Sequence, residues 1–283
     1  TKDATEFLHD TIPHYMLGSN DKMTKEITDA VLLMNHADTL GSIMKFDISE
    51  ETRNAIMIRT QEYEQLLANG EIVPEAILLL IPYMHIILAL TDRYAAICMN
   101  PPYMGSGRFD SVLSKYVKDN YEEGKADLFS VFMLLAIDRL LPNGKYGMIN
   151  MQSWMFLSSF EKLRTRLLTE NRIDNMLHLG PRTFDELSGE VVQNTAFVIT
   201  NCEGKDATGS YYRLVDGKSC GEKERMFLEA QENGGNRIYY PNVNQQDFEK
   251  IPGCPIGYWV SEKVISIFSK HPNMTQKVNA TQG

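Results

Sequence analysis

The sequence predicts an α/β fold in which a doubly wound sheet follows a helical segment. After residue 93, short apolar runs of strand length alternate with longer segments of helical periodicity, which is the pattern of strand–helix–strand units. Before residue 93, apolar residues recur at helical spacing instead. Hydrophobic residues make up 43% of the 283 residues and charged residues 23%. These shares are typical of a globular protein and exclude a disordered or collagen-like chain.

Residues 1–92 are expected to be mostly helical. Apolar side chains recur along 22–37, and a Gly-Ser turn then breaks the pattern. Ser49, followed by two acidic residues, predicts the start of a helix, and Asn69-Gly70 predicts its end. The segment 74–91 is apolar on nearly all sides, which is typical of a buried helix, and its apolar run is too short to span a membrane.

The strands are predicted from residue 94 onward. The first strand, 94–99, must end at Asn100-Pro101-Pro102-Tyr103, because prolines cannot continue a central ladder. We expect Arg164 and Arg166 on the solvent side of a later helix. The other predicted elements are helices at 126–141 and 156–170, a turn at 142–144, and strands at 146–151, 173–179, 194–200 and 210–215.

Charge and cysteine content exclude some classes of function. Lys and Arg number 28 against 37 Asp and Glu, a net charge of −9. The isoelectric point is near 5.2, which argues against binding nucleic acid by bulk charge alone. The four cysteines form no Cys-x-x-Cys pair. We therefore expect neither a disulfide framework nor a metal site, and a reducing cytoplasm fits best.

The tetrapeptide Asn100-Pro101-Pro102-Tyr103 is the motif that carries chemistry. Ligands of open α/β sheets bind beyond the carboxyl ends of the strands, where this tetrapeptide lies. Its residues suit methylation of a planar exocyclic amine such as that of adenine. The Asn100 side-chain oxygen and the Pro101 carbonyl would accept the two amine hydrogens while the nitrogen becomes tetrahedral. The prolines would hold these acceptors rigidly, and the Tyr103 ring would stack on the base.

An adenine inside duplex DNA must be flipped out of the stack before an enzyme can reach its amine, and it then needs an aromatic pocket. Phe184 lies in the loop between two predicted strands and is a second candidate wall. For Trp154, Phe156 and His178, packing is the default interpretation. A bare Asn-Pro pair commonly begins a turn, but its place at the end of a buried strand favours the functional interpretation.

Several segments, taken in order, resemble the motifs of adenine-specific DNA methyltransferases. The resemblance is strongest to the BREX methyltransferases (PglX) and their type IIG restriction-modification relatives, and it covers roughly residues 35–200. Residues 38–42 (DTLGS) resemble the stretch that precedes the catalytic motif in that class. The other segments are 97–105 (ICMNPPYMG), 125–129 (KADLF), 147–164, 178–180, 184–185 and 189–198.

The resemblance implies a Rossmann-like class I methyltransferase sheet, S-adenosylmethionine as the methyl donor, and an adenine of double-stranded DNA as the acceptor. It implies work in a phage-defence or restriction-modification system, with other subunits of a defence complex as partners. It carries Asn100-Pro101-Pro102-Tyr103 over as the catalytic loop and Phe184 as the base-stacking aromatic. Phe129 and Asp38 become candidate donor contacts, although a turn role that accepts backbone hydrogen bonds is the alternative for Asp38.

One departure concerns the glycine-rich donor loop of the family, which has no counterpart before Asn100. Residues 105–109 (GSGRF) imitate its ending but follow the catalytic strand. We therefore expect an incomplete sheet that lacks the N-terminal donor-binding strands, in an inactive fragment of a larger protein. Residues 1–92 would form a helical segment and 93–203 the catalytic half of the methyltransferase domain. Residues 204–283 would form a linker or the start of a target-recognition region.

Two other functions stay open at this point. The missing loop favours a non-catalytic scaffold subunit that binds DNA or protein in a defence complex. The same tetrapeptide also suits a methyltransferase that acts on a protein glutamine or an RNA amine. Retention of the whole tetrapeptide favours an enzyme, because a scaffold needs no rigid pair of acceptors.

Overall fold

The structure is a computed structural model that describes residues 11–12, 15, 21–184, 192–204, 206–234 and 237–270. The chain divides into two compact units, Thr1–Arg93 and Tyr94–Gly283, called unit 1 and unit 2 below. Residues 185 and 189–191 of the methyltransferase-like motifs lie outside the described residues.

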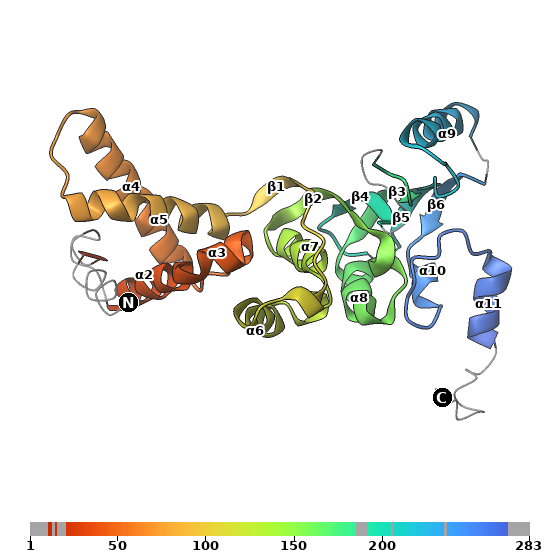
Figure 1. The fold of residues 1–283 in the computed structure, drawn as a ribbon, viewed down its shortest axis with the longest axis horizontal. Coiled ribbons are helices and arrows are strands. Elements are labelled where there is room, and N and C mark those ends of the chain that lie inside the picture. The colour runs from red at the N-terminus through yellow and green to blue at the C-terminus, as the bar shows by residue number, and fades with distance from the viewer. Residues whose placement is uncertain are drawn as a thin grey trace, which may run out of the picture. The chain divides into compact units, whose positions relative to one another are not determined.

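Unit 1 is helical, as its periodicity predicts (Figure 1). The side chain of Ser49 accepts the backbone N–H of Thr52 and so caps the helix that follows. Inside the unit, Tyr15 stacks on Tyr63 with 5.5 Å between ring centroids. The helices are α2 (Asp21–Leu33), α3 (Ala37–Leu40), α4 (Glu50–Ala68) and α5 (Glu75–Thr91).

Unit 2 is built on a six-stranded mixed sheet in the order β1-β2-β4-β3-β5-β6. β1 is parallel to β2, β4 is antiparallel to both of its neighbours, and β5 is parallel to β3. The carboxyl ends of β1, β2, β3 and β5 therefore lie at one edge of the sheet, together with the start of β4. The strands are β1 (Tyr94–Met99), β2 (Leu140–Met151), β3 (Arg172–Gly180), β4 (Asn194–Thr200), β5 (Thr208–Arg213) and β6 (Tyr239–Asn244).

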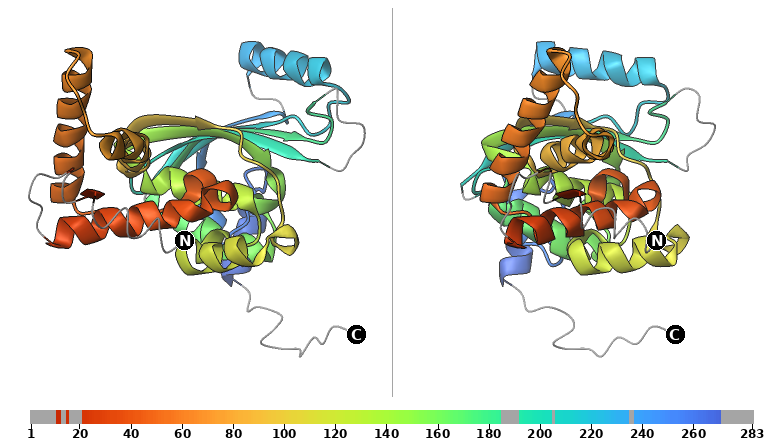
Figure 2. Two further views of the ribbon diagram at one scale, coloured as in Figure 1. Left: turned by 60° about the vertical axis from the view of Figure 1, so that its left-hand side comes forward. Right: turned by 90° about the vertical axis from the view of Figure 1, so that its left-hand side faces the viewer.

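The helices of unit 2 cover the sheet unequally. α7 and α8 lie on one face and α9 lies on the other (Figure 2). Side chains that point toward α7 and α8, such as Tyr146, Met148 and Phe197, are fully buried. The intervening Gly147 and Ile149 are only half-buried, so the opposite face is more open. The helices are α6 (Ser111–Asn120), α7 (Leu128–Asp138), α8 (Glu161–Glu170), α9 (Cys220–Asn233), α10 (Gln246–Glu249) and α11 (Glu262–Lys270).

Several predicted elements differ from the structure in bounds or shape. The helix expected at 126–141 is α7 and ends at Asp138, before β2 begins at Leu140, and the strand expected at 210–215 is β5, two residues earlier. The turn expected at 142–144 is a bulge inside β2, because Leu140 pairs with Tyr94 whereas Lys145 pairs with Ala96. Asn143 adopts a positive φ of 62° there, a conformation that asparagine tolerates better than most residues. The helix expected at 156–170 begins only at Glu161, after two short 3₁₀ turns.

The prediction that Arg164 faces solvent is wrong. Arg164 is 1% exposed, and its guanidinium donates hydrogen bonds to the backbone carbonyls of Trp154, Leu157, Gly253 and Cys254. Periodicity alone could not show this, because the carbonyls of Gly253 and Cys254 come from a loop about ninety residues further along the chain.

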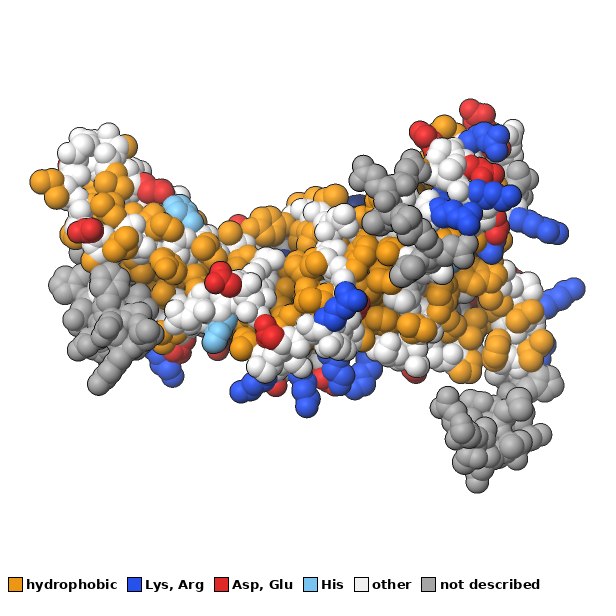
Figure 3. All heavy atoms as spheres, in the orientation of Figure 1, with side chains coloured by type: hydrophobic (Ala, Val, Ile, Leu, Met, Phe, Trp, Pro, Cys, Tyr) orange, Lys and Arg blue, Asp and Glu red, His pale blue; other side chains and the backbone are white. Residues whose placement is uncertain are grey.

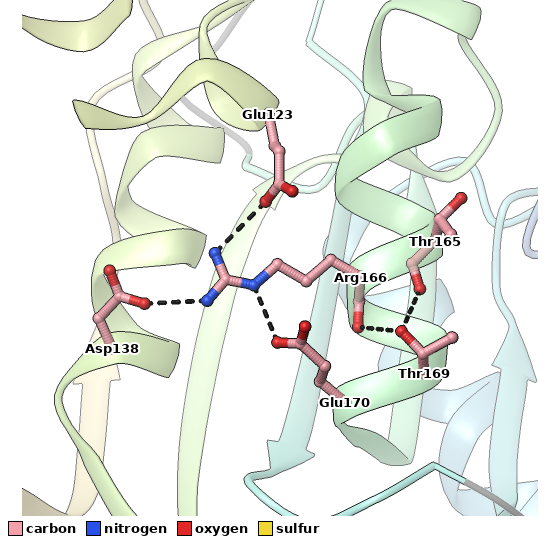
Figure 4. A network of polar contacts seen from close by, with 6 residues as sticks. All are labelled: Glu123, Asp138, Thr165, Arg166, Thr169 and Glu170. Atoms are coloured by element: carbon pink, nitrogen blue, oxygen red, sulfur yellow. Dashed lines mark hydrogen bonds and ion pairs between the residues drawn. The ribbon is translucent and has the colours of Figure 1, made fainter. Parts of the chain in front are cut away.

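Arg166, by contrast, lies part-exposed among three carboxylates. It contacts Glu123 at 3.3 Å, Asp138 at 3.0 Å and Glu170 at 3.0 Å (Figure 4). These partners come from a 3₁₀ turn, from α7 and from α8 itself. Arg166 therefore ties α8 to its neighbours at the surface.

Two segments after residue 204 belong to the same sheet. They contribute β5, which pairs with β3, and β6, which pairs with β5.

Among the helices of the described part of the chain, none has the length and apolar character needed to cross a membrane.

Candidate active site

The segment Asn100–Tyr103 leaves β1 at its carboxyl end, on the sheet edge described above. β1 is the outermost strand and its residues are exposed or half-buried, so the expectation of a buried strand is wrong. Pro101 is buried and Tyr103 is half-buried, whereas Asn100 and Pro102 are exposed. Among the described residues, no donor reaches the carbonyl of Pro101. The segment therefore presents two oxygen acceptors, the side chain of Asn100 and the backbone of Pro101, on a proline-stiffened turn.

Asp127 anchors the end of this loop. Its Oδ1 accepts the backbone N–H of Met104 at 3.0 Å and that of Phe129 at 3.2 Å. One carboxylate thus caps the start of α7 and holds the loop exit, and Gly105 forms an isolated β-bridge with the same residue. Burial raises the pKa of Asp127, and the backbone hydrogen bonds oppose that rise.

The hydroxyl of Tyr103 is held by residues from two further strands. Asn194 at the start of β4 donates to it through Nδ2 at 3.0 Å. The hydroxyl in turn lies 3.4 Å from Oδ1 of Asn100 and 3.5 Å from the carbonyl of Ile149. The Tyr103 ring meets Phe129 edge-on at 6.5 Å. These contacts fix the orientation of the ring beside Asn100.

Two buried asparagines extend this network across the sheet edge. Nδ2 of Asn194 also donates to the carbonyl of Asn150 at 3.3 Å, and the indole of Trp154 donates to Oδ1 of Asn150 at 3.1 Å. Asn150, Asn194 and Trp154 are all fully buried. Among the described residues, Oδ1 of Asn194 has no hydrogen-bond partner. The packing interpretation of Trp154 is confirmed.

Sequence reasoning did not find the contact of Asn194 with Tyr103, nor any role for Asn150. A usable signal was present: Asn150 lies next to the end of one apolar strand and Asn194 at the start of another, both at the edge that carries Asn100–Tyr103. A buried polar side chain in that position needs a hydrogen-bond partner. Here Asn194 finds its partners in Tyr103 and the carbonyl of Asn150, and Asn150 finds its partner in Trp154.

A groove of about 450 Å³ opens next to Asn100 and crosses β1, β2, β4 and β3. This volume lies within the range of small-molecule sites. Its walls are mostly apolar, with Asn100 and Asn175 as the amide side chains. The lining residues are Cys98, Met99, Asn100, Gly147, Met148, Ile149, Asn175, Leu177, Ala196, Phe197 and Val198.

Of the remaining predicted site residues, Phe129 contacts the Tyr103 network, and Phe184 and Asp38 lie elsewhere in the described part of the chain. Phe129 contacts Tyr103 but is fully buried against Phe160. Phe184 follows β3 and is 36% exposed. Asp38 lies exposed on α3 in unit 1. The roles of Phe184 in base stacking and of Phe129 and Asp38 in donor binding stay predictions.

Charged side chains on α9 alternate in sign. In Figure 3, Lys and Arg side chains over this helix are interleaved with Asp and Glu. Arg225, for example, lies 4.0 Å from Glu222 and 3.8 Å from Glu229. This helix therefore offers no uniformly basic surface for a nucleic acid.

Comparison with known proteins places these features in a family. The sequence model of the Eco57I restriction-modification methylase family matches residues 18–184, a range that includes the whole Asn100–Tyr103 loop. The chain is 38% identical over 250 residues to the adenine-specific methyltransferase BrxX of Escherichia coli O9:H4 (strain HS). It is 45% identical over 179 residues to the adenine-specific methyltransferase PglX of Lacticaseibacillus casei (strain Zhang).

These alignments cover 88% and 63% of the chain, but the chain spans only 20% and 15% of the lengths of the two relatives. Among solved structures, the methyltransferase subunit of a type I restriction-modification system from Streptococcus thermophilus superimposes with a TM-score of 0.43 at 14% identity. That superposition covers 60% of this chain and 39% of the other. Because the family model matches more than half of the residues of this chain, the chain belongs to the Eco57I restriction-modification methylase family.

Proposed function

We propose that the protein to which this chain belongs transfers a methyl group from S-adenosylmethionine to the exocyclic amine of a flipped adenine in double-stranded DNA. The observation that carries this proposal is the exposed amide of Asn100 next to the free carbonyl of Pro101, on a stiff turn at the carboxyl end of β1. The membership of a restriction-modification methylase family supports it, as do relatives that are named adenine-specific methyltransferases.

The two acceptors match the chemistry that this reaction requires. The amino nitrogen of adenine shares its lone pair with the ring and is a poor nucleophile. When Oδ1 of Asn100 and the carbonyl of Pro101 accept hydrogen bonds from its two N–H groups, the nitrogen becomes tetrahedral and its lone pair is freed for attack. The new N–CH₃ bond forms as the S–CH₃ bond breaks, the sulfur leaves as a neutral thioether, and one amine proton passes to solvent. Pre-positioned acceptors act without reorganisation during the reaction.

The ring of Tyr103 is proposed to stack on the flipped base. Asn194, Asn100 and Phe129 hold this ring and its hydroxyl in place. The Tyr103 side chain therefore loses little conformational entropy when the base binds. Burial raises the pKa of the Tyr103 phenol, so the ring stays neutral and able to donate a hydrogen bond at neutral pH. Phe184 is proposed as the second wall of the base pocket.

The groove beside Asn100 is proposed to hold part of the methyl donor, because it is a mostly apolar space of about 450 Å³ that Asn100 itself lines. The donor would supply an electrophilic methyl group there. Asp38 stays a proposed donor contact. Phe129, whose ring is fully buried, is proposed to act on the donor site by holding Tyr103 in place. Work with other subunits of a phage-defence or restriction-modification complex is part of the same proposal.

The test is a transfer assay with the full-length protein. Methyl-labelled S-adenosylmethionine is offered together with DNA, RNA and protein acceptors, and the methylated product is identified by mass spectrometry. The proposal predicts N6-methyladenine in duplex DNA. Methylation of RNA or protein alone would replace the proposed acceptor, and binding to DNA without any transfer would favour the scaffold function instead.

A further inference from the structure

A second group of aromatic rings lies at the same sheet edge, where β3 ends. His178 is 5% exposed, and the ring of Trp259 stacks on it with a centroid distance of 6.0 Å. Phe156 meets both rings, at 5.9 Å from His178 and 5.7 Å from Trp259. Unlike a core aromatic, Trp259 is 40% exposed, and Phe156 is half-buried.

A directed chain of hydrogen bonds runs from this group toward the catalytic loop. Tyr258 meets Nδ1 of His178 at 2.9 Å, and Nε2 of His178 meets Oε1 of Gln152 at 2.7 Å. Nε2 of Gln152 then donates to Oε1 of Gln193 at 2.5 Å. Since the Gln152 oxygen can only accept, His178 carries its proton on Nε2 and accepts at Nδ1 from the Tyr258 hydroxyl.

His178 is neutral in this arrangement. Burial, together with the positive charges of Arg213 and Lys223, lowers the pKa of His178 to about 4. The chain of hydrogen bonds ends at the exposed amide of Gln193, which Gln152 links to the neutral ring of His178.

The aromatic group and the catalytic loop are linked through neighbouring residues. Gln193 directly precedes Asn194, which holds Tyr103 at 3.0 Å. The strand order places β3 three positions from β1. At about 4.8 Å per strand this amounts to about 14 Å, which matches about four base steps along a DNA strand at 3.4 Å each.

We propose that Phe156 and Trp259 stack on a nucleobase that flanks the target adenine, and that the amide of Gln193 hydrogen-bonds to the edge of this base. The inference rests on the proposed DNA methylation. Aromatic rings bind unstacked bases of any sequence, and a glutamine amide offers both a donor and an acceptor to a base edge.

The test uses the full-length protein and a duplex that contains the adenine it methylates. Single thymines within about five nucleotides of that adenine are replaced by 5-iododeoxyuridine, the complex is irradiated, and the cross-linked peptide is identified by mass spectrometry. We expect a cross-link to Trp259 or Phe156. A side chain that is only structural would not cross-link to DNA.

Substitution gives a second readout. We expect Trp259→Ala to raise the KM for DNA by about 5- to 150-fold, the loss measured when one base-stacking ring is removed, while kcat stays within about twofold. Trp259→Phe should recover most of the affinity. Tyr83→Ala, which removes a ring of similar exposure (42%) on α5, is the control and should change neither constant.

The possible failures are distinguishable. If the unsubstituted full-length protein methylates no DNA, the proposed function fails and the inference falls with it. If the duplex is methylated but the cross-links lie on other residues, and Trp259→Ala keeps the parental KM, the flanking-base contact alone is overturned.

Discussion

Replacement of Arg164 by methionine should loosen the edge that carries the candidate site. The guanidinium holds the carbonyls of Trp154 and Leu157, which follow β2, and those of Gly253 and Cys254, which precede Trp259. Methionine keeps much of the apolar contact and removes every hydrogen bond. Since hydrogen bonds to a charged donor contribute about 1.5–3 kcal/mol each and water replaces some of them, we expect a net loss of about 3–5 kcal/mol.

Hydrogen exchange of the full-length protein, read by mass spectrometry on peptides that cover 150–170 and 250–260, measures this loss locally. A loss of 3 kcal/mol corresponds to at least 100-fold faster exchange where the segments open. Arg166→Met is the matched control, because its carboxylate partners are part-exposed and should contribute about 1 kcal/mol in total. Equal effects of the two substitutions would refute the argument from burial.

Three further predictions follow from the site. Tyr103→Phe keeps the ring but leaves Asn194 with one acceptor, so single-turnover methylation should slow about fivefold; an unchanged rate would contradict the network. Burial depresses the pKa of His178 to about 4 in the folded protein. The stability that the neutral ring contributes is therefore present above pH 6.5 and falls by about 2 kcal/mol between pH 7 and pH 5. His178→Asn should lose less stability on acidification than the parent in urea unfolding, and an equal loss would count against a neutral histidine. Asp127→Ala should lower the free energy of unfolding by about 1–2 kcal/mol, measured by thermal unfolding. Asp127→Asn keeps the hydrogen bonds to the backbone of Met104 and Phe129 and should change it little. Equal losses in the two variants would show that these hydrogen bonds do not stabilise the loop.

Local signals predicted a large part of the fold. The bounds of β1 and β4 agree with the sequence analysis, because prolines or polar residues stop both apolar runs. The helix expected after Ser49 begins at Glu50 and ends at Ala68, because the capping side chain and the Asn-Gly pair act within one turn of the chain.

Contacts between distant parts of the chain could not be predicted in this way. The hydrogen bond of Asn194 with Tyr103 joins residues 91 positions apart, and the bonds of Arg164 to Gly253 span 89. The mixed strand order depends equally on long-range pairing. The motif thus located the candidate site at the end of β1, whereas the side chains that orient it became visible only in the folded structure.

The most direct test of the proposed mechanism is Asn100→Ala in the full-length protein, with methyl transfer and DNA affinity measured in parallel. We expect transfer to fall about 100-fold or more, because one pre-positioned polar partner of the reacting amine is lost, while the Kd for DNA changes less than about threefold. Asn54→Ala, which removes an exposed amide on α4 in unit 1, is the control and should leave transfer unchanged. Transfer within tenfold of the parent in Asn100→Ala would contradict the central claim that this amide grips the amine of the target base.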